Sequence, residues 1–166
     1  MNLAYYGSSF TVGSDPILVT ALGLFVTSTP PSGVVRIYRN GTNTNLAAAT
    51  VDTNDLLSDD GRYRFEAITP ITLQPGMSYT VIAHYDGGRL VRHAAGLTTQ
   101  TGITFLGARA GGSGVPFTFG DGEGNGPYLG ATFEFTIASP VPEPSTTGLF
   151  AIAFLAVVVR KVSSRP

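Results

Sequence analysis

Two histidines are the side chains of this sequence best suited to acid–base catalysis, because imidazole changes its charge near neutral pH. They are His84 and His93. A hydrolase would pair one of them with the hydroxyl group of Ser8 or Ser9, or with the carboxylate of Asp86. No Gly-x-Ser-x-Gly turn accompanies them, and the two are not spaced as His-x-His or His-x-x-x-His. The pattern therefore favours structural histidines over a catalytic or metal-binding pair.

Oxygen-bearing side chains alternate with glycine in residues 121–126, which is how a calcium loop begins. The ligands would be Asp121, Glu123 and Asn125. A complete loop also needs a Glu at its twelfth position, where this sequence has Thr132, and flanking helices. We interpret the segment as a Gly-rich hairpin or surface loop and expect no cofactor and no metal. Calcium bound by these three residues is the alternative.

Carbohydrate chemistry is a third possibility. A glycosidase places two carboxyl groups on either side of its substrate, and Glu66 and Glu134 lie on the polar faces of two expected strands. Because solvated sheet faces normally carry such residues, we favour the structural interpretation. Stacking on a sugar would instead use tyrosine rings, and the candidates are Tyr5, Tyr6, Tyr63, Tyr79, Tyr85 and Tyr128. Alternation assigns Tyr63 and Tyr79 to the core.

Composition and charge exclude several function classes. The sequence has 166 residues, of which 13% are charged and none is cysteine. This rules out disulfides, thiol catalysis and Cys-rich zinc sites. Residues 1–159 carry seven Arg against eleven Asp and Glu, a balance of −4, and the last seven residues add +3. An acidic body without a basic stripe argues against nucleic-acid binding.

Short segments of alternating apolar and polar residues predict an all-β body. Phe133, Phe135 and Ile137, for example, share one face of an expected strand. Turn signals such as Asn40-Gly41 and Gln74-Pro75-Gly76 separate these segments. The expected strands cover residues 10–12, 17–27, 34–39, 46–51, 62–68, 78–85, 103–108 and 131–137. Before residue 145 no segment has a sustained helical period.

These elements predict an antiparallel two-layer β-sandwich over residues 1–137, with a small closed barrel as the alternative. Residues 17–27 are apolar on both alternating faces, as expected of a central strand covered on both sides. The body is followed by a linker at residues 138–147, an apolar run at residues 148–159 and a basic end at residues 160–166. The expected fold is thus all-β with a C-terminal apolar transmembrane-type helix.

The apolar run would form a helix about 18 Å long, whereas the hydrocarbon core of a bilayer is about 30 Å thick. The uncharged stretch extends back to Ser145, basic side chains can snorkel, and a bilayer can thin, so a membrane helix is still our interpretation. A helix packed on the sandwich is the alternative. The anchoring side chains would be Leu149, Phe150, Ile152, Phe154, Leu155, Val157, Val158 and Val159. Arg160, Lys161 and Arg165 would stay in the cytoplasm and leave the body outside.

The last 26 residues resemble a known signal. A Val-Pro-Glu-Pro-Ser-Thr segment, an apolar run and a basic end, in this order, resemble the Pro-Glu-Pro C-terminal (PEP-CTERM) sorting signal of Gram-negative, polysaccharide-producing bacteria. The resemblance implies recognition of Pro142, Glu143 and Pro144 by exosortase, an integral-membrane cysteine protease thought to cleave near the motif. It also implies that the apolar run is the membrane anchor and that Arg160, Lys161 and Arg165 are the stop. Here Val162, Ser163 and Ser164 dilute the basic end.

The body has a less specific resemblance. Its succession of Phe10-Thr11-Val12, residues 19–23, residues 46–51 and residues 72–79 is similar to an uncharacterised β-sandwich domain often found ahead of such tails. That resemblance spans about residues 8–137 and implies the fold but no activity.

These observations predict an exported, non-enzymatic protein of the cell envelope or extracellular matrix, with a structural or adhesive role. It would pass through an inner-membrane intermediate whose body lies in the periplasm. The alternatives are a module that binds exopolysaccharide and, third, an envelope hydrolase that uses His84 or Glu134. Residues 1–6 do not resemble a secretory signal, so we expect that the natural N-terminus lies upstream or that the signal was omitted.

Overall fold

The computed structural model describes residues 5–26, 32–42, 44–85, 100–111 and 130–138. Within these ranges the chain forms antiparallel strands and no helix. The strands are β1 (Tyr5–Val12), β2 (Ile17–Phe25), β3 (Gly33–Arg39), β4 (Thr44–Val51), β5 (Leu56–Leu57), β6 (Tyr63–Leu73), β7 (Ser78–Tyr85), β8 (Ile103–Gly111) and β9 (Ala131–Ile137).

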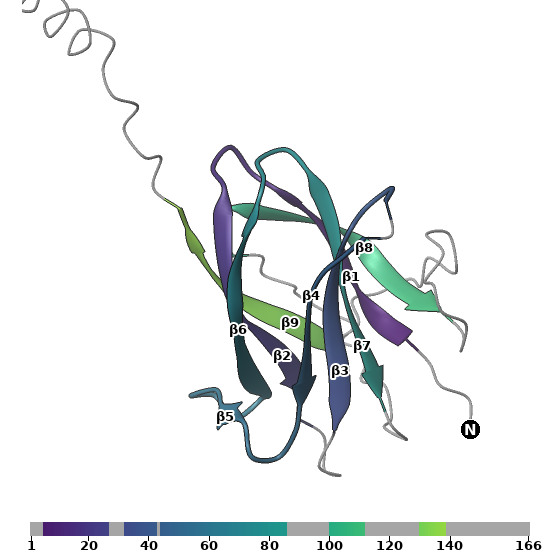
Figure 1. Ribbon diagram of the computed structural model, residues 1–166, viewed down its shortest axis with the longest axis vertical. Coiled ribbons are helices and arrows are strands. Elements are labelled where there is room, and N and C mark those ends of the chain that lie inside the picture. Colours follow the sequence, from purple (N-terminus) through teal and green to yellow (C-terminus); the bar gives the residue numbers. More distant parts are fainter. Residues whose placement is uncertain (1–4, 27–31, 43, 86–99, 112–129, 139–166) are drawn as a thin grey trace, which may run out of the picture.

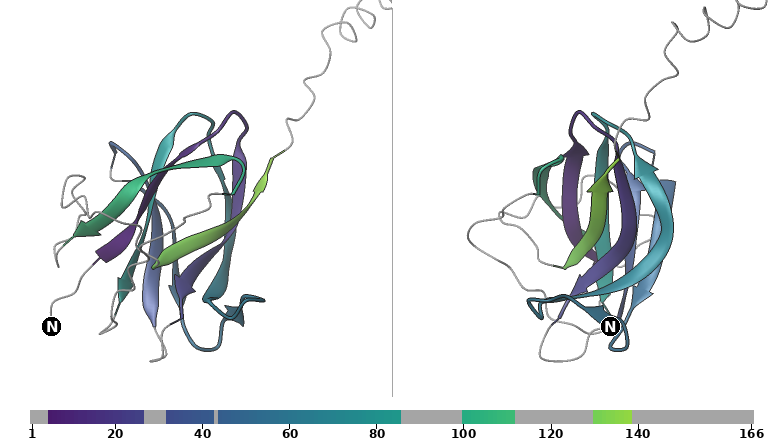
Figure 2. Two further views of the ribbon diagram at one scale, coloured as in Figure 1. Left: turned by 180° about the vertical axis from the view of Figure 1, so that it is seen from behind. Right: turned by 90° about the vertical axis from the view of Figure 1, so that its left-hand side faces the viewer.

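Two separate sheets pack as layers (Figure 1, Figure 2). Sheet A has the strand order β4-β3-β7-β1-β8, and sheet B has the order β5-β6-β2-β9. This arrangement confirms the predicted antiparallel two-layer sandwich rather than a closed barrel. The helix expected at residues 148–159 lies outside the described residues.

The core fills the space between the two sheets. Sheet B contributes Ile17, Val19, Leu22 and Leu24 from β2, all fully buried. Sheet A meets them with side chains from β1, β3 and β7, among them Phe10, Val35, Ile37, Tyr79 and Val81. Burying large aliphatic and aromatic side chains is the dominant stabilising contribution in such a sandwich.

Two of the predicted turns have the backbone that their sequence indicates. Gly41 has φ of 82° in the Asn40-Gly41 turn, and Gly76 has φ of 68° after Pro75. Both values lie in the left-handed region, where glycine has no Cβ to clash. The amide of Gly76 also donates to the carbonyl oxygens of Val12, at 2.9 Å, and Gly13, at 3.1 Å. These bonds join the β6–β7 turn to the β1–β2 turn at one end of the sandwich.

The assignment of Tyr79 to the core is confirmed, whereas that of Tyr63 is wrong. Tyr79 is buried, and its hydroxyl group accepts a hydrogen bond from the amide of Gln74 at 2.9 Å. Tyr63 pairs with Phe25, which alternates with the buried Leu24. The register with β2 therefore turns Tyr63 to the outer face of sheet B.

The strand at residues 17–27 is only partly as expected. Its described part is a central strand of sheet B with one face in the core. On its other face Ala21 and Gly23 are also buried. Gly23 is covered by side chains of neighbouring strands in the same sheet. A Cβ atom added at Gly23 would lie 2.4 Å from the Phe65 ring and 2.6 Å from Thr132.

Candidate functional site

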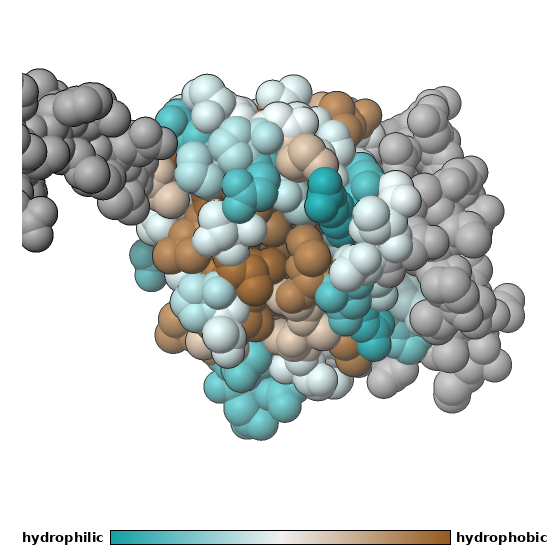
Figure 3. Space-filling view, turned by 45° about the horizontal axis from the view of Figure 1, so that its top comes forward, coloured by the Kyte–Doolittle hydropathy of each residue, from teal (hydrophilic) through white to brown (hydrophobic). Residues whose placement is uncertain are grey.

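The two sheets stand apart along one side of the sandwich, where β4 faces β6. A groove of about 680 Å³ lies between these strands. It is lined by residues 46–50 of β4 and by Glu66, Ala67, Ile68, Thr69 and Ile71 of β6. We call it the β4–β6 groove. In the space-filling view hydrophobic side chains gather in the middle of the molecular face, with hydrophilic side chains around them (Figure 3).

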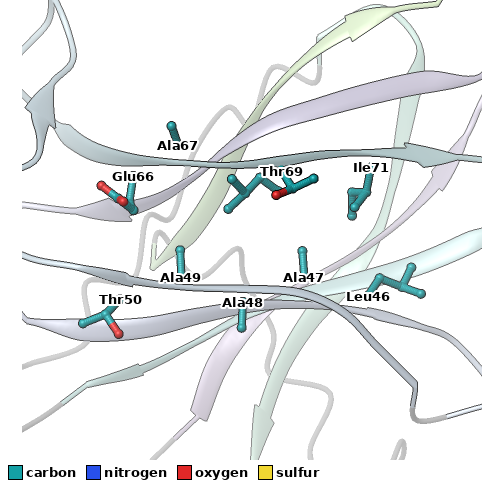
Figure 4. Close-up of a pocket in the computed structure, with 10 residues that line it drawn as sticks. Leu46, Ala47, Ala48, Ala49, Thr50, Glu66, Ala67, Thr69 and Ile71 are labelled. Carbon is teal, nitrogen blue, oxygen red and sulfur yellow. The ribbon is translucent and has the colours of Figure 1, made fainter.

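Small side chains on β4 leave this groove open. Ala47 and Ala49 point toward β6, whereas Glu66 and Ile71 point toward β4 (Figure 4). Ala48 points away from the groove. Ala47 and Ala49 pack against the edge of the core but fill little of the space in front of β6. The result is a hollow with both apolar and polar lining, flanked by two strand backbones.

Both strands expose backbone at this side. β4 is the first strand of sheet A, and its one partner among the described strands is β3. β6 pairs with β2 along its length but with the two-residue strand β5 only at Arg64 and Phe65. Free backbone amides and carbonyls at a sheet edge can hydrogen-bond an additional extended chain.

Three carboxyl groups lie at the end of the groove where β4 leads into β5. The amide of Asp52 donates to the Asp55 carboxylate at 2.6 Å, and Arg64 Nη1 donates to the Asp55 carbonyl oxygen at 2.6 Å. A hydrogen bond with the Asp55 carboxyl group, together with the charges of Asp55 and Asp52, raises the pKa of Glu66 above its ordinary value of 4.5. Asp52, Asp55 and Glu66 outnumber the guanidinium of Arg64 at this mouth of the groove, so a further cation is favoured there.

A second candidate surface lies on the outer face of sheet B. The rings of Phe25 and Tyr63 meet edge to face at 5.4 Å, and those of Tyr63 and Phe65 lie 6.2 Å apart. All three side chains are partly exposed. Beside Phe65 is a depression of about 390 Å³, whose lining also includes Thr20, Gln100, Phe133, Glu134, Phe135 and Thr136. Aromatic rings next to hydroxyl, amide and carboxyl groups are the usual composition of a sugar-binding surface.

The predicted histidine site is not assembled by the described residues. His84 stacks against Tyr5, with ring centroids 4.9 Å apart, and its buried Nε2 has no hydrogen-bond partner among the described residues. Ser8 pairs with Val81, which faces the core, so it lies on the opposite face of sheet A from His84. His93 and Asp86 lie outside the described residues.

The other serine considered, Ser9, is engaged elsewhere. It is buried, and its Oγ lies 2.7 Å from Thr80 Oγ1. Because the Thr80 hydroxyl group donates its proton to Asn40 Oδ1 at 2.8 Å, the proton between Ser9 and Thr80 comes from Ser9. Ser9 therefore holds β1 and β7 together through Thr80 and does not contact His84 in this network.

The two candidate glycosidase carboxylates do not face one another. Glu66 pairs with the buried Leu22 and points toward β4. Glu134 pairs with Ala21, the preceding residue of β2, and so lies on the opposite face of sheet B. Among the described residues no group of three His, Asp or Glu side chains is suited to hold a metal ion. The calcium candidates Asp121, Glu123 and Asn125 lie outside those residues.

The sequence did not point to the β4–β6 groove, although it contains one signal of it. Three successive alanines, Ala47-Ala48-Ala49, stand in an expected strand where larger β-branched side chains are usual. The sorting-signal residues Pro142, Glu143 and Pro144, the apolar run and the basic end all lie outside the described ranges. Within those ranges no helix is long and apolar enough to cross a membrane.

Comparison with known proteins identifies the C-terminal segment. Residues 140–162 match the family model of the PEP-CTERM protein-sorting motif. The matched residues include Pro142, Glu143 and Pro144 and extend through Arg160 and Lys161, whereas Arg165 lies beyond them. Searches of curated proteins and of solved structures gave no significant match. The match confirms the sequence-based identification of the sorting signal.

Proposed function

Because this chain carries the sorting signal of exported PEP-CTERM proteins, which exosortase processes on their way to the cell surface, we propose that its β-sandwich has a structural or adhesive role there. The observation that carries the proposal is the order of the folded body and the sorting signal along the chain. The last strand, β9, ends at Ile137, and the matched signal begins at residue 140. A completed two-sheet body thus stands wholly before the signal and remains intact when the signal is removed.

In this proposal each part of the tail has a physical task. Pro142 and Pro144 disfavour helix around Glu143, and an extended backbone is what a protease needs for access. The apolar run at residues 148–159 holds the intermediate in the inner membrane, and Arg160, Lys161 and Arg165 keep its end in the cytoplasm. The body then lies in the periplasm until cleavage releases it to the envelope or the extracellular matrix.

A motif variant in the native host tests this role of the tail. Replacing Pro142, Glu143 and Pro144 together by alanine is expected to retain the full-length chain in the membrane fraction. The control is Pro70→Ala, which changes an exposed proline of β6 outside the motif and should leave the distribution unchanged. Immunoblots of surface, membrane and medium fractions report the result. Normal surface delivery of the triple variant would overturn the assigned role of these three residues.

A specific observation also favours the second candidate function, binding of exopolysaccharide. The Phe25, Tyr63 and Phe65 rings lie on the outer face of sheet B, beside a depression lined in part by Thr20, Gln100 and Glu134. Sugar rings stack on exposed aromatic faces while their hydroxyl groups bond to neighbouring polar side chains. Burial raises the pKa of the Tyr63 phenol above its ordinary value of 10.0.

Retention on immobilised exopolysaccharide from the host tests this candidate. Phe65→Ala is expected to abolish any retardation of the protein on the column. Tyr38→Ala is the matched control, because Tyr38 is a partly buried aromatic residue on the outer face of sheet A. No retardation of the unaltered protein, or equal loss with both variants, would exclude this surface as the sugar site.

A further inference from the structure

The free edge of β4 has few of the features that protect a sheet edge against pairing. Proteins protect edge strands with charged side chains, prolines, β-bulges or short length. β9 carries Glu134, β5 has only two residues, and β8 pairs irregularly with β1 between Ser9 and Phe10. The free part of β6 carries Glu66 and Pro70. β4 is eight residues long and has neither a charged residue nor a proline, and its irregular pairing with β3, opposite Ile37 and Tyr38, lies toward its N-terminal end.

An added strand at this edge would also cover apolar surface. Leu46, Ala47 and Ala49 are partly buried at the rim of the core and line the β4–β6 groove. A strand hydrogen-bonded to β4 in the plane of sheet A would carry every second side chain over this groove. Main-chain hydrogen bonds and burial of apolar surface would then stabilise the same contact.

The charges around β4 indicate which strand fits. Carboxyl groups of Asp52, Asp55 and Glu66 gather at the C-terminal end of β4. At its other end the exposed Arg39 of β3 pairs with Thr44. The middle of β4 is neutral. A strand that complements this pattern is neutral in its middle, with a cation beside the acidic end and carboxylates beside Arg39.

We propose that the strand is β4 of a second copy of this chain, paired antiparallel across a two-fold axis. Antiparallel pairing brings the acidic end of each copy next to Arg39 of the other, and it sets small neutral side chains opposite one another. It joins the two five-stranded sheets A into one continuous sheet and merges the two grooves into a single trough. This proposal rests on the sandwich and not on the sorting signal.

The expected contact is weak in dilute solution. One pair of eight-residue strands buries less surface than a stable interface of about 1,200–2,000 Å². We therefore expect a dissociation constant in about the micromolar to millimolar range, so that the contact forms mainly where copies are concentrated, as on a surface. Added salt should raise this dissociation constant several-fold, because the contacts between the charged groups at the two ends of β4 are ionic and exposed.

Single-cysteine variants of the full chain test the pairing directly, because the natural sequence has no cysteine. One variant is made at each of residues 46–50, and disulfide-linked dimers are quantified after mild oxidation. A two-fold antiparallel pair has one self-opposed position, so dimer yield should peak at one position and fall on both sides. Thr72→Cys is the matched control, because Thr72 is an exposed residue of β6 that pairs with Leu18 and does not line the groove.

A pair of lysine variants distinguishes self-association through strand pairing from self-association through the tail. Ala48→Lys sets a charge in the middle of the neutral edge and should lower self-association at least tenfold in sedimentation experiments. Thr72→Lys places the same charge on β6 and should leave self-association unaltered. A flat cross-linking profile, yields no higher than those of Thr72→Cys, or equal association of the two lysine variants would each overturn the proposal. So would cross-links formed only to other proteins of the host.

Discussion

The centre of the sandwich and its β4–β6 side differ in the size of the side chains that face one another there. In the centre, large side chains such as Leu22, Ile37 and Leu24 from the two sheets meet and are fully buried. At the side, Ala47 and Ala49 face β6, and a groove of about 680 Å³ is left between the strands. The sandwich stays open where small side chains of β4 face β6, and Glu66, Thr50 and Thr69 also line this opening.

Because of this difference, the centre provides the stability of the fold, whereas the side is available for interaction. A closed centre holds the sheets together without any partner, because dispersion contacts and apolar burial are complete there. The open side contributes less to folding and leaves both apolar surface and strand backbone available. Substitutions that are costly in the centre should therefore be tolerated at the side.

The largest difference in stability between the centre and the β4–β6 side is expected when a large side chain is removed. Leu22→Ala opens a cavity among fully buried residues and should lower the free energy of unfolding by about 2–5 kcal/mol. Leu46→Ala removes the same atoms from the partly exposed rim of the groove and should cost about 1 kcal/mol. Urea unfolding followed by circular dichroism measures both values. Equal losses would mean that the side is packed as tightly as the centre.

Adding a large side chain should give a smaller difference in stability between the two regions, again with the larger loss in the centre. Ala83→Leu forces extra volume into the closed centre, where Ala83 is fully buried, and should destabilise the fold by about 1–3 kcal/mol. Ala49→Leu places the same atoms in the β4–β6 groove and should change stability by less than about 1 kcal/mol in either direction. Thermal unfolding of the two variants, measured under the same conditions, compares these two changes in stability. A loss at Ala49 as large as that at Ala83 would contradict the open groove.

The smallest expected effect concerns charge at the mouth of the groove. The folded-state pKa of Glu66 is raised by Asp55 and Asp52, so its protonated form stabilises the fold. That stabilisation is complete below the ordinary pKa of 4.5 and is lost as pH rises through the raised folded-state pKa. Glu66→Gln should thus match the unaltered protein in acid and be more stable than it at neutral pH.

Melting temperatures across the pH range provide the measurement for Glu66→Gln. Glu134→Gln is the matched control for the charge change, since Glu134 lies on the other face of sheet B. If Glu66→Gln were less stable than the unaltered protein at neutral pH, the carboxyl groups would be held by compensating cations and the mouth would not be negative.

Most of the fold could be predicted from local sequence. Alternation and turn residues located at least part of every described strand of six or more residues, although β1 begins at Tyr5 and β6 extends to Leu73. The left-handed φ angles of Gly41 and Gly76 agree with their turns. These features depend on neighbouring residues alone. The two-residue strand β5 carries no such signal and was not predicted.

The face of a strand that turns inward was harder to predict. Alternation placed Tyr63 in the core, but the register of β6 against β2 decides which face meets the core. That register includes an irregularity between Val19 and Ala21, and it turns the aromatic side outward. Likewise, the groove depends on strand order, which places β4 opposite β6 in another sheet.

The sorting signal was predictable for a different reason. It is a short linear motif in which Pro142, Glu143 and Pro144, the apolar run and the basic end follow one another directly. A linear motif needs no tertiary structure to be identified. The role of the body has no such motif, so its candidate surfaces came from the packing of the sheets.

The central claim is that the tail is a sorting signal and that the sandwich is what remains at the surface. Intact mass of the protein recovered from the surface and membrane fractions of its native host tests it most directly. We expect a surface form whose last residue lies near Pro142 to Thr146, within the matched segment. A surface or soluble form that still ends at Pro166 would contradict the claim and make the apolar run part of the folded body.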